Sequence, residues 1–147
     1  FDSKEALAFP HRDDRLQRFN ELLEASFAAG NPFDGLRRIA TIFAREYSAK
    51  RVQLIQQQKL IDAVPNLAAR EHEIDRDWEH ALAAAFLPHL AEGGDAECRA
   101  RVLAGATIGV IRATMRYWFD HDGTPDLAQL GLEAIDGLER GFLAIPP

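Results

Sequence analysis

Arg112 is the polar residue most clearly placed to bind a partner, because it falls on an otherwise apolar helical face. At helical spacing it shares that face with Ile108 and Met115. A buried guanidinium is costly unless it is paired, and its planar fork suits a carboxylate or a phosphate group. We therefore expect Arg112 either to clamp an acidic group of a ligand or to form an internal ion pair. The candidate internal partners are Glu71 and Asp77.

Two further polar side chains lie beside apolar residues. Gln58 follows Leu54 by one helical turn and could hydrogen-bond to a ligand, unless it is an exposed member of the glutamine run at 56–58. Tyr47 has an apolar ring and a polar hydroxyl, which suits the rim of a pocket. Simple packing of the ring is the alternative for Tyr47.

A segment rich in histidine and carboxylates has the residue types of a metal site, but their spacing is wrong for one. His72 and His80 are eight residues apart, whereas ligands on one helix face are three or four apart. Helical geometry instead places Glu71, Asp75 and Glu79 in one row, which we interpret as a charged, solvated face. We expect no metal and no other cofactor. No catalytic triad or glycine-rich phosphate loop is present in the sequence, so we expect no enzyme.

The elements that would position these residues are helices. Apolar residues recur at helical spacing in nearly every segment, and no stretch alternates as a strand would. Gly30, Asn31 and Pro32 provide a stop, a cap and a first-turn proline in that order. The sequence therefore predicts an all-α fold. A short helix begins at about Ser3, and another helix begins at Pro32. Further helices span about 13–29, 49–63, 65–88, 95–119 and 126–143.

A small-molecule site in such a fold would be an apolar cavity between helices with a few polar groups inside. Aromatic and aliphatic side chains on the inner stripes supply the expected walls, although each would serve equally well as plain core. Their character favours a small apolar or aromatic ligand. The expected ligand-binding residues are Phe19, Leu23, Phe27, Phe43, Tyr47, Leu54, Gln58, Trp78, Leu82, Ile108, Arg112 and Met115.

The last two helices differ from the others in being apolar on more than one side. The stretch 102–110 is apolar on almost every side, so we expect it to be buried on several faces. Small residues recur every four positions within it, which lets another helix approach closely. We expect these two helices to pack against their copies as a four-helix bundle. The expected interface residues are Gly105, Gly109, Ala113, Trp118, Leu127, Leu130, Ala134, Leu138 and Phe142.

Composition and charge limit the function further. The chain has 147 residues, the size of one domain, with 47% hydrophobic and 27% charged residues, which argues against disorder. A net charge of −6 opposes binding to DNA or to an anionic membrane by these residues alone. No apolar run is long enough to span a membrane. The single cysteine, Cys98, fits a reducing cytoplasm. The first residue is Phe1 rather than Met, so we expect further residues upstream.

The opening segment, 1–7, resembles the end of the helix-turn-helix domain in TetR-family regulators. There an aromatic residue precedes a small or polar pair and then Lys-Glu-x-Leu, as in Phe1-Asp2-Ser3-Lys4-Glu5-Ala6-Leu7. The closing half, with its long helix ending near Trp118, a polar turn and a terminal helix, also resembles the family's C-terminal domain. The resemblance implies that residues 1–9 end the DNA-binding domain and begin the connecting helix. Residues 10–147 would then form the ligand-binding and dimerisation domain.

The same resemblance implies a cytoplasmic, homodimeric repressor that releases its operator DNA when a small molecule binds. The DNA would be read by a helix-turn-helix preceding Phe1, and Lys4 maps onto a position that contacts backbone phosphate in the family. A solvated lysine at a helix start is the alternative for Lys4. The signal would pass from the cavity through the first long helix to residues 3–7. The competing function is a helical dimerisation or protein-interaction module without a ligand, which would have a filled core instead of a cavity.

Overall fold

The computed structural model describes residues 3–28, 30–90 and 93–141. Within these ranges the chain forms seven α-helices and one 3-10 turn, with no strand, and the predicted all-α class is confirmed. The elements are α1 (Ser3–Ala8), α2 (Arg12–Phe27), α3 (Pro32–Ala49), α4 (Arg51–Ala63), α5 (Pro65–Phe86), η1 (Leu87–His89), α6 (Ala96–Asp120) and α7 (Leu127–Arg140).

Local capping signals set several of these boundaries, close to where the sequence predicts them. The Asn31 side chain accepts a hydrogen bond from the Phe33 backbone N–H at 2.9 Å and begins α3, with proline in its first turn. Asp126 caps α7 in the same way, accepting from the Gln129 N–H at 3.2 Å. Gly141 ends α7 in the left-handed conformation, at a φ of 62°.

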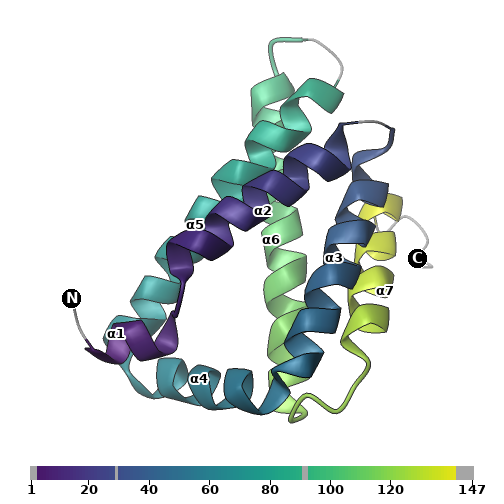
Figure 1. Cartoon of the computed structure of the whole chain (residues 1–147). Helices are drawn as coiled ribbons and strands as arrows, with labels where there is room; N and C mark the ends of the chain where they lie inside the picture. Colours follow the sequence, from purple (N-terminus) through teal and green to yellow (C-terminus); the bar gives the residue numbers. More distant parts are fainter. Residues whose placement is uncertain (1–2, 29, 91–92, 142–147) are drawn as a thin grey trace, which may run out of the picture.

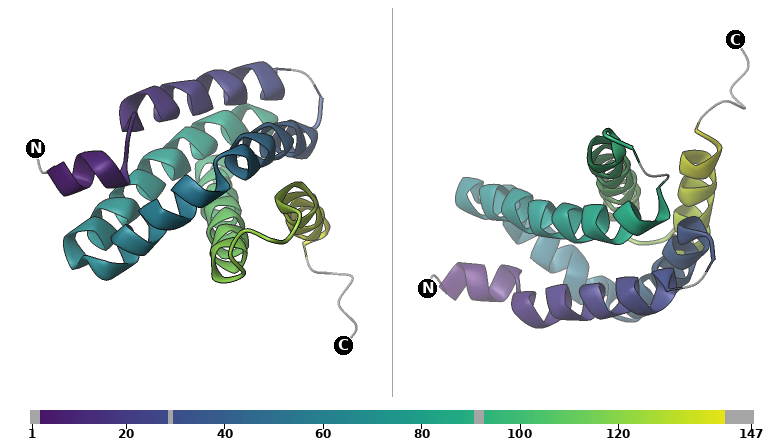
Figure 2. Two further views of the ribbon diagram at one scale, coloured as in Figure 1. Left: turned by 60° about the horizontal axis from the view of Figure 1, so that its bottom comes forward. Right: turned by 90° about the horizontal axis from the view of Figure 1, so that it is seen from above.

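The helices enclose a three-sided arrangement (Figure 1). In that view α2 and α5 run diagonally along one side, α3 and α7 stand together along another, and α4 crosses the base. Figure 2 shows that α5 lies between α2 and α6, in agreement with its packing against both of them and against α4. The short helix α1 lies at the corner where α4 meets α5, so the N-terminal end of the chain borders two walls of the interior.

The main hydrophobic core lies where α2, α3, α5, α6 and α7 meet. Leu82 and Phe86 of α5 have no exposed surface, and Leu23 and Phe27 of α2 are at most 4% exposed. The Phe27 and Phe86 rings lie 5.3 Å apart between centroids. This part of the interior is filled by closely packed side chains.

The expectation that residues 102–110 are buried on several faces is only partly correct. Ala104, Thr107 and Ile108 are buried, but Val102 is 66% exposed in the single chain. Ala106 is exposed too, and Gly109 has no other side chain within 4 Å of the position that a Cβ would occupy. One face of α6 is therefore apolar and uncovered in the single chain.

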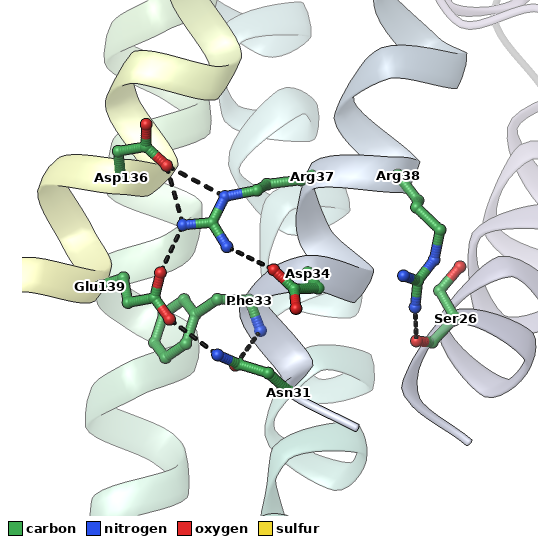
Figure 3. A network of polar contacts seen from close by, with 8 residues as sticks. All are labelled: Ser26, Asn31, Phe33, Asp34, Arg37, Arg38, Asp136 and Glu139. Atoms are coloured by element: carbon green, nitrogen blue, oxygen red, sulfur yellow. Dashed lines mark hydrogen bonds and ion pairs between the residues drawn. The ribbon is translucent and has the colours of Figure 1, made fainter. Parts of the chain in front are cut away.

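An ion-pair network fastens α7 to α3 (Figure 3). The Arg37 guanidinium donates to Asp136 at 2.8 and 3.0 Å and to Asp34 at 2.7 Å, and it also pairs with Glu139. The Asn31 amide donates to the other Glu139 oxygen at 2.8 Å. The hydrogen bond from Arg37 lowers the pKa of Glu139 below its usual value. Since these contacts join the start of α3 to the end of α7, they hold α7 at a fixed angle to α3.

Candidate functional site

The larger cavity lies at the end of the molecule where α1, α4, α5 and α6 converge. Its volume is about 220 Å³, and its wall includes the corner between α1 and α2. The wall is mostly apolar, with charged and amide side chains at several points. The lining residues are Ala8, Phe9, Pro10, Arg12, Arg15, Tyr47, Leu54, Gln57, Gln58, Ile61, Glu71, Ile74, Asp75, Trp78, Ile108, Ile111, Arg112, Met115, Arg116 and Phe119.

Glu71 is the carboxylate of this wall that has no ion-pair partner among the described residues. It is half-buried, and this burial raises the pKa of Glu71 above its ordinary value. The Gln58 side chain lies close enough to Glu71 to favour the ionised form of this carboxyl, and its amide donates to Asp62 at 3.0 Å. Gln58 is only 8% exposed, so the exposed-residue interpretation of the glutamine run is wrong for it.

The cavity arginines are mostly paired with carboxylates of neighbouring helices. The Arg112 Nε atom lies 3.1 Å from an Asp75 oxygen, so the ion pair expected with Glu71 or Asp77 forms with a different residue. Arg116 donates to both oxygens of Asp62 at 2.8 and 3.1 Å, and this lowers the pKa of Asp62. Arg12 pairs with Asp77 at 3.0 Å.

Arg15 is held by an aromatic residue instead. Its guanidinium donates to the Tyr47 hydroxyl at 2.8 Å and lies 5.5 Å from the centre of the same ring. It forms no ion pair with a carboxylate within the described ranges. Tyr47 therefore lies at the wall of the cavity, with its polar tip already occupied by a neighbour.

A second cavity of about 140 Å³ adjoins the first, between α3, α6 and α7. The two share four wall residues: Tyr47, Trp78, Ile111 and Met115. Trp78 stacks on Phe19 with 4.1 Å between ring centroids, and Phe19 belongs both to the main core and to the wall of the second cavity.

The structure brings most of the predicted ligand-binding residues to one of these cavities. Tyr47, Leu54, Gln58, Trp78, Ile108, Arg112 and Met115 line the larger one, and Phe19 and Phe43 line the smaller. Leu23, Phe27 and Leu82 line neither, because they lie inside the filled core.

From the sequence, Glu71 is only a candidate ion-pair partner of Arg112, and neither Glu71 nor Asp75 is predicted to lie in the ligand site. Both were assigned to a solvated face, but the structure places them in the cavity wall, whereas His72 and His80 are exposed. A signal was available: the apolar stripe of this helix runs through Leu67, skips one turn at Glu71 and resumes at Ile74. A charged residue that replaces one member of a buried stripe faces the same interior as its neighbours.

The residues predicted to form a dimer interface lie in several different surroundings. Trp118 is 0% exposed and donates to the Pro125 carbonyl at 3.2 Å, and Leu127 is 5% exposed, so both belong to the core of a single protomer. Gly105 faces Glu79 of its own chain. Gly109 borders open space, Ala113 is exposed, and Phe142 lies outside the described residues. The remaining three, Leu130, Ala134 and Leu138 of α7, are half-buried.

The other candidate residues lie away from the cavities. Lys4 of α1 and Cys98 of α6 are exposed. In the described part of the chain no three histidine, cysteine or carboxylate side chains gather as a metal site would require. None of its helices is both long enough and apolar enough to cross a membrane.

Comparison with known families identifies the domain. Residues 31–143 match the family model described as the MftR C-terminal domain, a TetR-type regulatory domain, and this match covers α3 to α7. Comparisons with curated proteins and with solved structures found no match. The chain therefore belongs to the TetR family of transcriptional regulators, of which it carries a C-terminal regulatory domain.

Proposed function

We propose that this chain is the sensor and dimerisation domain of a transcriptional repressor that releases its operator when a small molecule enters the larger cavity. The observation that carries the proposal is the position of the cavity. Its wall includes Ala8, Phe9 and Pro10, at the corner where α1 turns into α2. A DNA-binding head on the N-terminal side of α1 would be attached directly to this wall.

Specific contacts could transmit a change in the cavity to α1. Glu5 of α1 pairs with Arg70 of α5 at 2.6 Å, and Ala8 packs with Ile61 of α4 and Leu67 of α5. A ligand that separates α4 from α5 would therefore shift α1. Such a ligand controls DNA binding only to the extent that it binds one arrangement of the helices more tightly than the other.

We further propose that the protein is a homodimer, formed through α6 and α7. Support comes from the uncovered apolar face of α6, where Val102 is 66% and Tyr117 is 49% exposed. Gly109, between them, would allow a second helix to approach closely. A two-fold dimer suits operator DNA, in which two half-sites are read by two identical heads.

The proposal is tested with the complete gene product and the DNA upstream of its gene, in a gel-retardation assay. We expect retardation without ligand and release when a compound that stabilises the protein thermally is added. The Met115→Trp variant, which fills the cavity, should keep DNA binding and lose the release, whereas the surface variant Val52→Trp should behave as the wild type.

Two outcomes would overturn the proposal. Equal release from the Met115→Trp variant would place the ligand elsewhere. If no compound in an amphipathic library stabilised the protein, the alternative of a dimerisation module without a ligand would be favoured.

A further inference from the structure

The charges of the larger cavity indicate what kind of ligand it takes, if the proposed function holds. The ionised form of Glu71 is disfavoured by burial, as well as by Asp75 on the same helix and Asp62 on α4. It is favoured by the neighbouring Gln58 side chain and by Arg116 of α6. Among the described residues Glu71 nevertheless has no ion pair of its own, because Arg116 bonds to Asp62. A positive charge placed beside Glu71 would supply the partner that the protein does not.

The cavity wall has fewer available charged partners for an anionic ligand. Three of its four arginines already bond to carboxylates: Arg12 to Asp77, Arg112 to Asp75 and Arg116 to Asp62. An acidic ligand that captured one of these guanidiniums would leave a protein carboxylate without its partner. Such an exchange gains little, since one ion pair is broken for each one formed.

Arg15 is the remaining cation, and it is the strongest argument for an acidic ligand. Its guanidinium is, however, already engaged by both the hydroxyl and the ring of Tyr47. It also lies near Glu46, whose pKa is lowered chiefly by the hydrogen bond from Arg18 and to a smaller extent by the charge of Arg15. Arg15 therefore needs a new partner less than Glu71 does.

The rest of the wall suits an apolar or aromatic body. Ile74 and Trp78 lie on the same helix as Glu71, one and two turns beyond it, and Ile108 and Met115 face them from α6. Aromatic rings attract organic cations through their electron-rich faces, in addition to their apolar contact area.

We propose that the cavity binds an amphipathic organic cation, whose protonated nitrogen pairs with the Glu71 carboxylate while its apolar body lies against Trp78, Ile108 and Met115. This inference assigns a chemical class to the ligand of the proposed sensor. Of the two alternatives that the sequence left open for Arg112, it favours the ion pair within the chain over the clamp on an acidic ligand.

The experiment compares three probes that share one aromatic body: naphthylmethylamine, naphthylmethanol and naphthoate. Binding of each to the purified chain is measured by isothermal titration calorimetry at about pH 8, where a free carboxylate is ionised and most of an arylmethylamine is protonated. We expect the amine to bind at least about tenfold more tightly than the alcohol or the acid.

Matched variants locate the charge. Glu71→Gln keeps the shape of the side chain and should reduce amine affinity to that of the alcohol, without weakening the alcohol itself. Glu73→Gln removes an exposed carboxylate from the same helix and should leave all three affinities unchanged. Because Glu71→Gln removes a carboxylate whose burial is unfavourable, we expect this variant to fold.

The outcomes separate this inference from the proposed function. If naphthoate binds most tightly and Arg15→Gln abolishes this binding, the proposal of a cationic ligand is contradicted. The proposed small-molecule sensor is not contradicted by that result. Equal binding of all three probes, or an amine preference that survives Glu71→Gln, would also overturn the proposal of a cationic ligand. If none of the three probes binds, both the cation and the small-molecule sensor are contradicted.

Discussion

The two halves of α5 border different kinds of interior. Toward its C-terminal end, Leu82 and Phe86 are fully buried in the main core, and neither lines either of the two cavities. Toward its N-terminal end, Glu71 and Asp75 face the larger cavity together with Trp78. One helix thus contributes a closely packed end and a hollow end, and the Phe19–Trp78 stack lies at the boundary between them.

This difference indicates which residues determine the stability of the fold and which determine ligand affinity. A side chain in the filled core has neighbours on all sides, so its truncation leaves a void and forfeits many contacts. A side chain in the cavity wall already borders empty space and loses fewer contacts when shortened. We therefore expect the filled core to dominate stability and the cavity wall to dominate ligand affinity.

The largest expected effect comes from truncation within the filled core. Leu82→Ala should reduce the free energy of unfolding by about 2–5 kcal/mol, whereas Met115→Ala, in the cavity wall, should cost about 1 kcal/mol. Urea denaturation followed by circular dichroism measures both. Equal losses in the two variants would show that the two interiors are packed alike.

Two glycines allow the same comparison between a closely packed position and an open one. A Cβ on Gly35 would lie 2.7 Å from both the Phe27 ring and the Ser26 carbonyl oxygen, so Gly35→Ala should cost about 1–3 kcal/mol. A Cβ on Gly109 meets nothing, so Gly109→Ala should stabilise the monomer by up to about 1 kcal/mol through helix propensity.

The dimer responds differently if α6 packs against its copy. In that case Gly109→Ala should weaken self-association in sedimentation equilibrium while it stabilises the monomer. An unchanged dissociation constant would mean that a partner does not approach α6 at this position.

The α3–α7 network should contribute less than either packing effect. Arg37 is partly exposed, at 24% of its side-chain surface, so Arg37→Ala should lower the unfolding midpoint by less than Gly35→Ala does. The loss should shrink as salt is raised, because exposed ion pairs are screened. A loss independent of salt would mean that packing of the arginine stem, and not charge, holds α7 to α3.

The smallest expected effect is a change in the pH dependence of stability. Burial raises the folded-state pKa of Glu71 above its unfolded value of about 4.5. The folded state therefore keeps this proton longer, and the free energy of unfolding should fall as pH rises between the unfolded and folded pKa values. Glu71→Gln should remove this decline, as measured by urea titrations across that range.

Asp62, close to the same cavity, should make a contribution to stability with the opposite pH dependence. Its pKa is lowered by Arg116, so its contribution is present above about pH 3.8 and lost as pH falls through the lower folded-state value. The Asp62→Asn variant should lose stability at neutral pH, unlike Glu71→Gln. A stability loss at neutral pH in both variants would contradict the view that Glu71 lacks a partner.

The fold could be predicted from sequence because its signals are local. Proline, glycine and asparagine at 30–32 define a helix start within three residues, and Asn31 caps α3 as expected. The apolar stripes then identified residues of both interiors, although they could not distinguish core residues such as Leu82 from cavity residues such as Trp78. That distinction depends on how completely the opposing helices fill the space.

The charged residues of the site were harder to predict for the same reason. Which carboxylate meets Arg112 depends on the register between α5 and α6, and a shift of one turn exchanges Glu71 for Asp75. Trp118 was assigned to an interface because its stripe is apolar, yet it is buried by α3 and α7 of its own chain, where Ala44 and Leu127 pack beside it.

The most direct test uses Met115, the only methionine of the chain, whose side chain lines both cavities. Its isotopically labelled methyl group gives one assigned signal in an NMR spectrum. Upon titration with naphthylmethylamine we expect a saturable shift of this signal and a nuclear Overhauser contact from the naphthalene ring to the methyl group. Saturable binding that leaves the Met115 methyl signal unchanged would contradict the account, because the ligand would then occupy another part of the molecule.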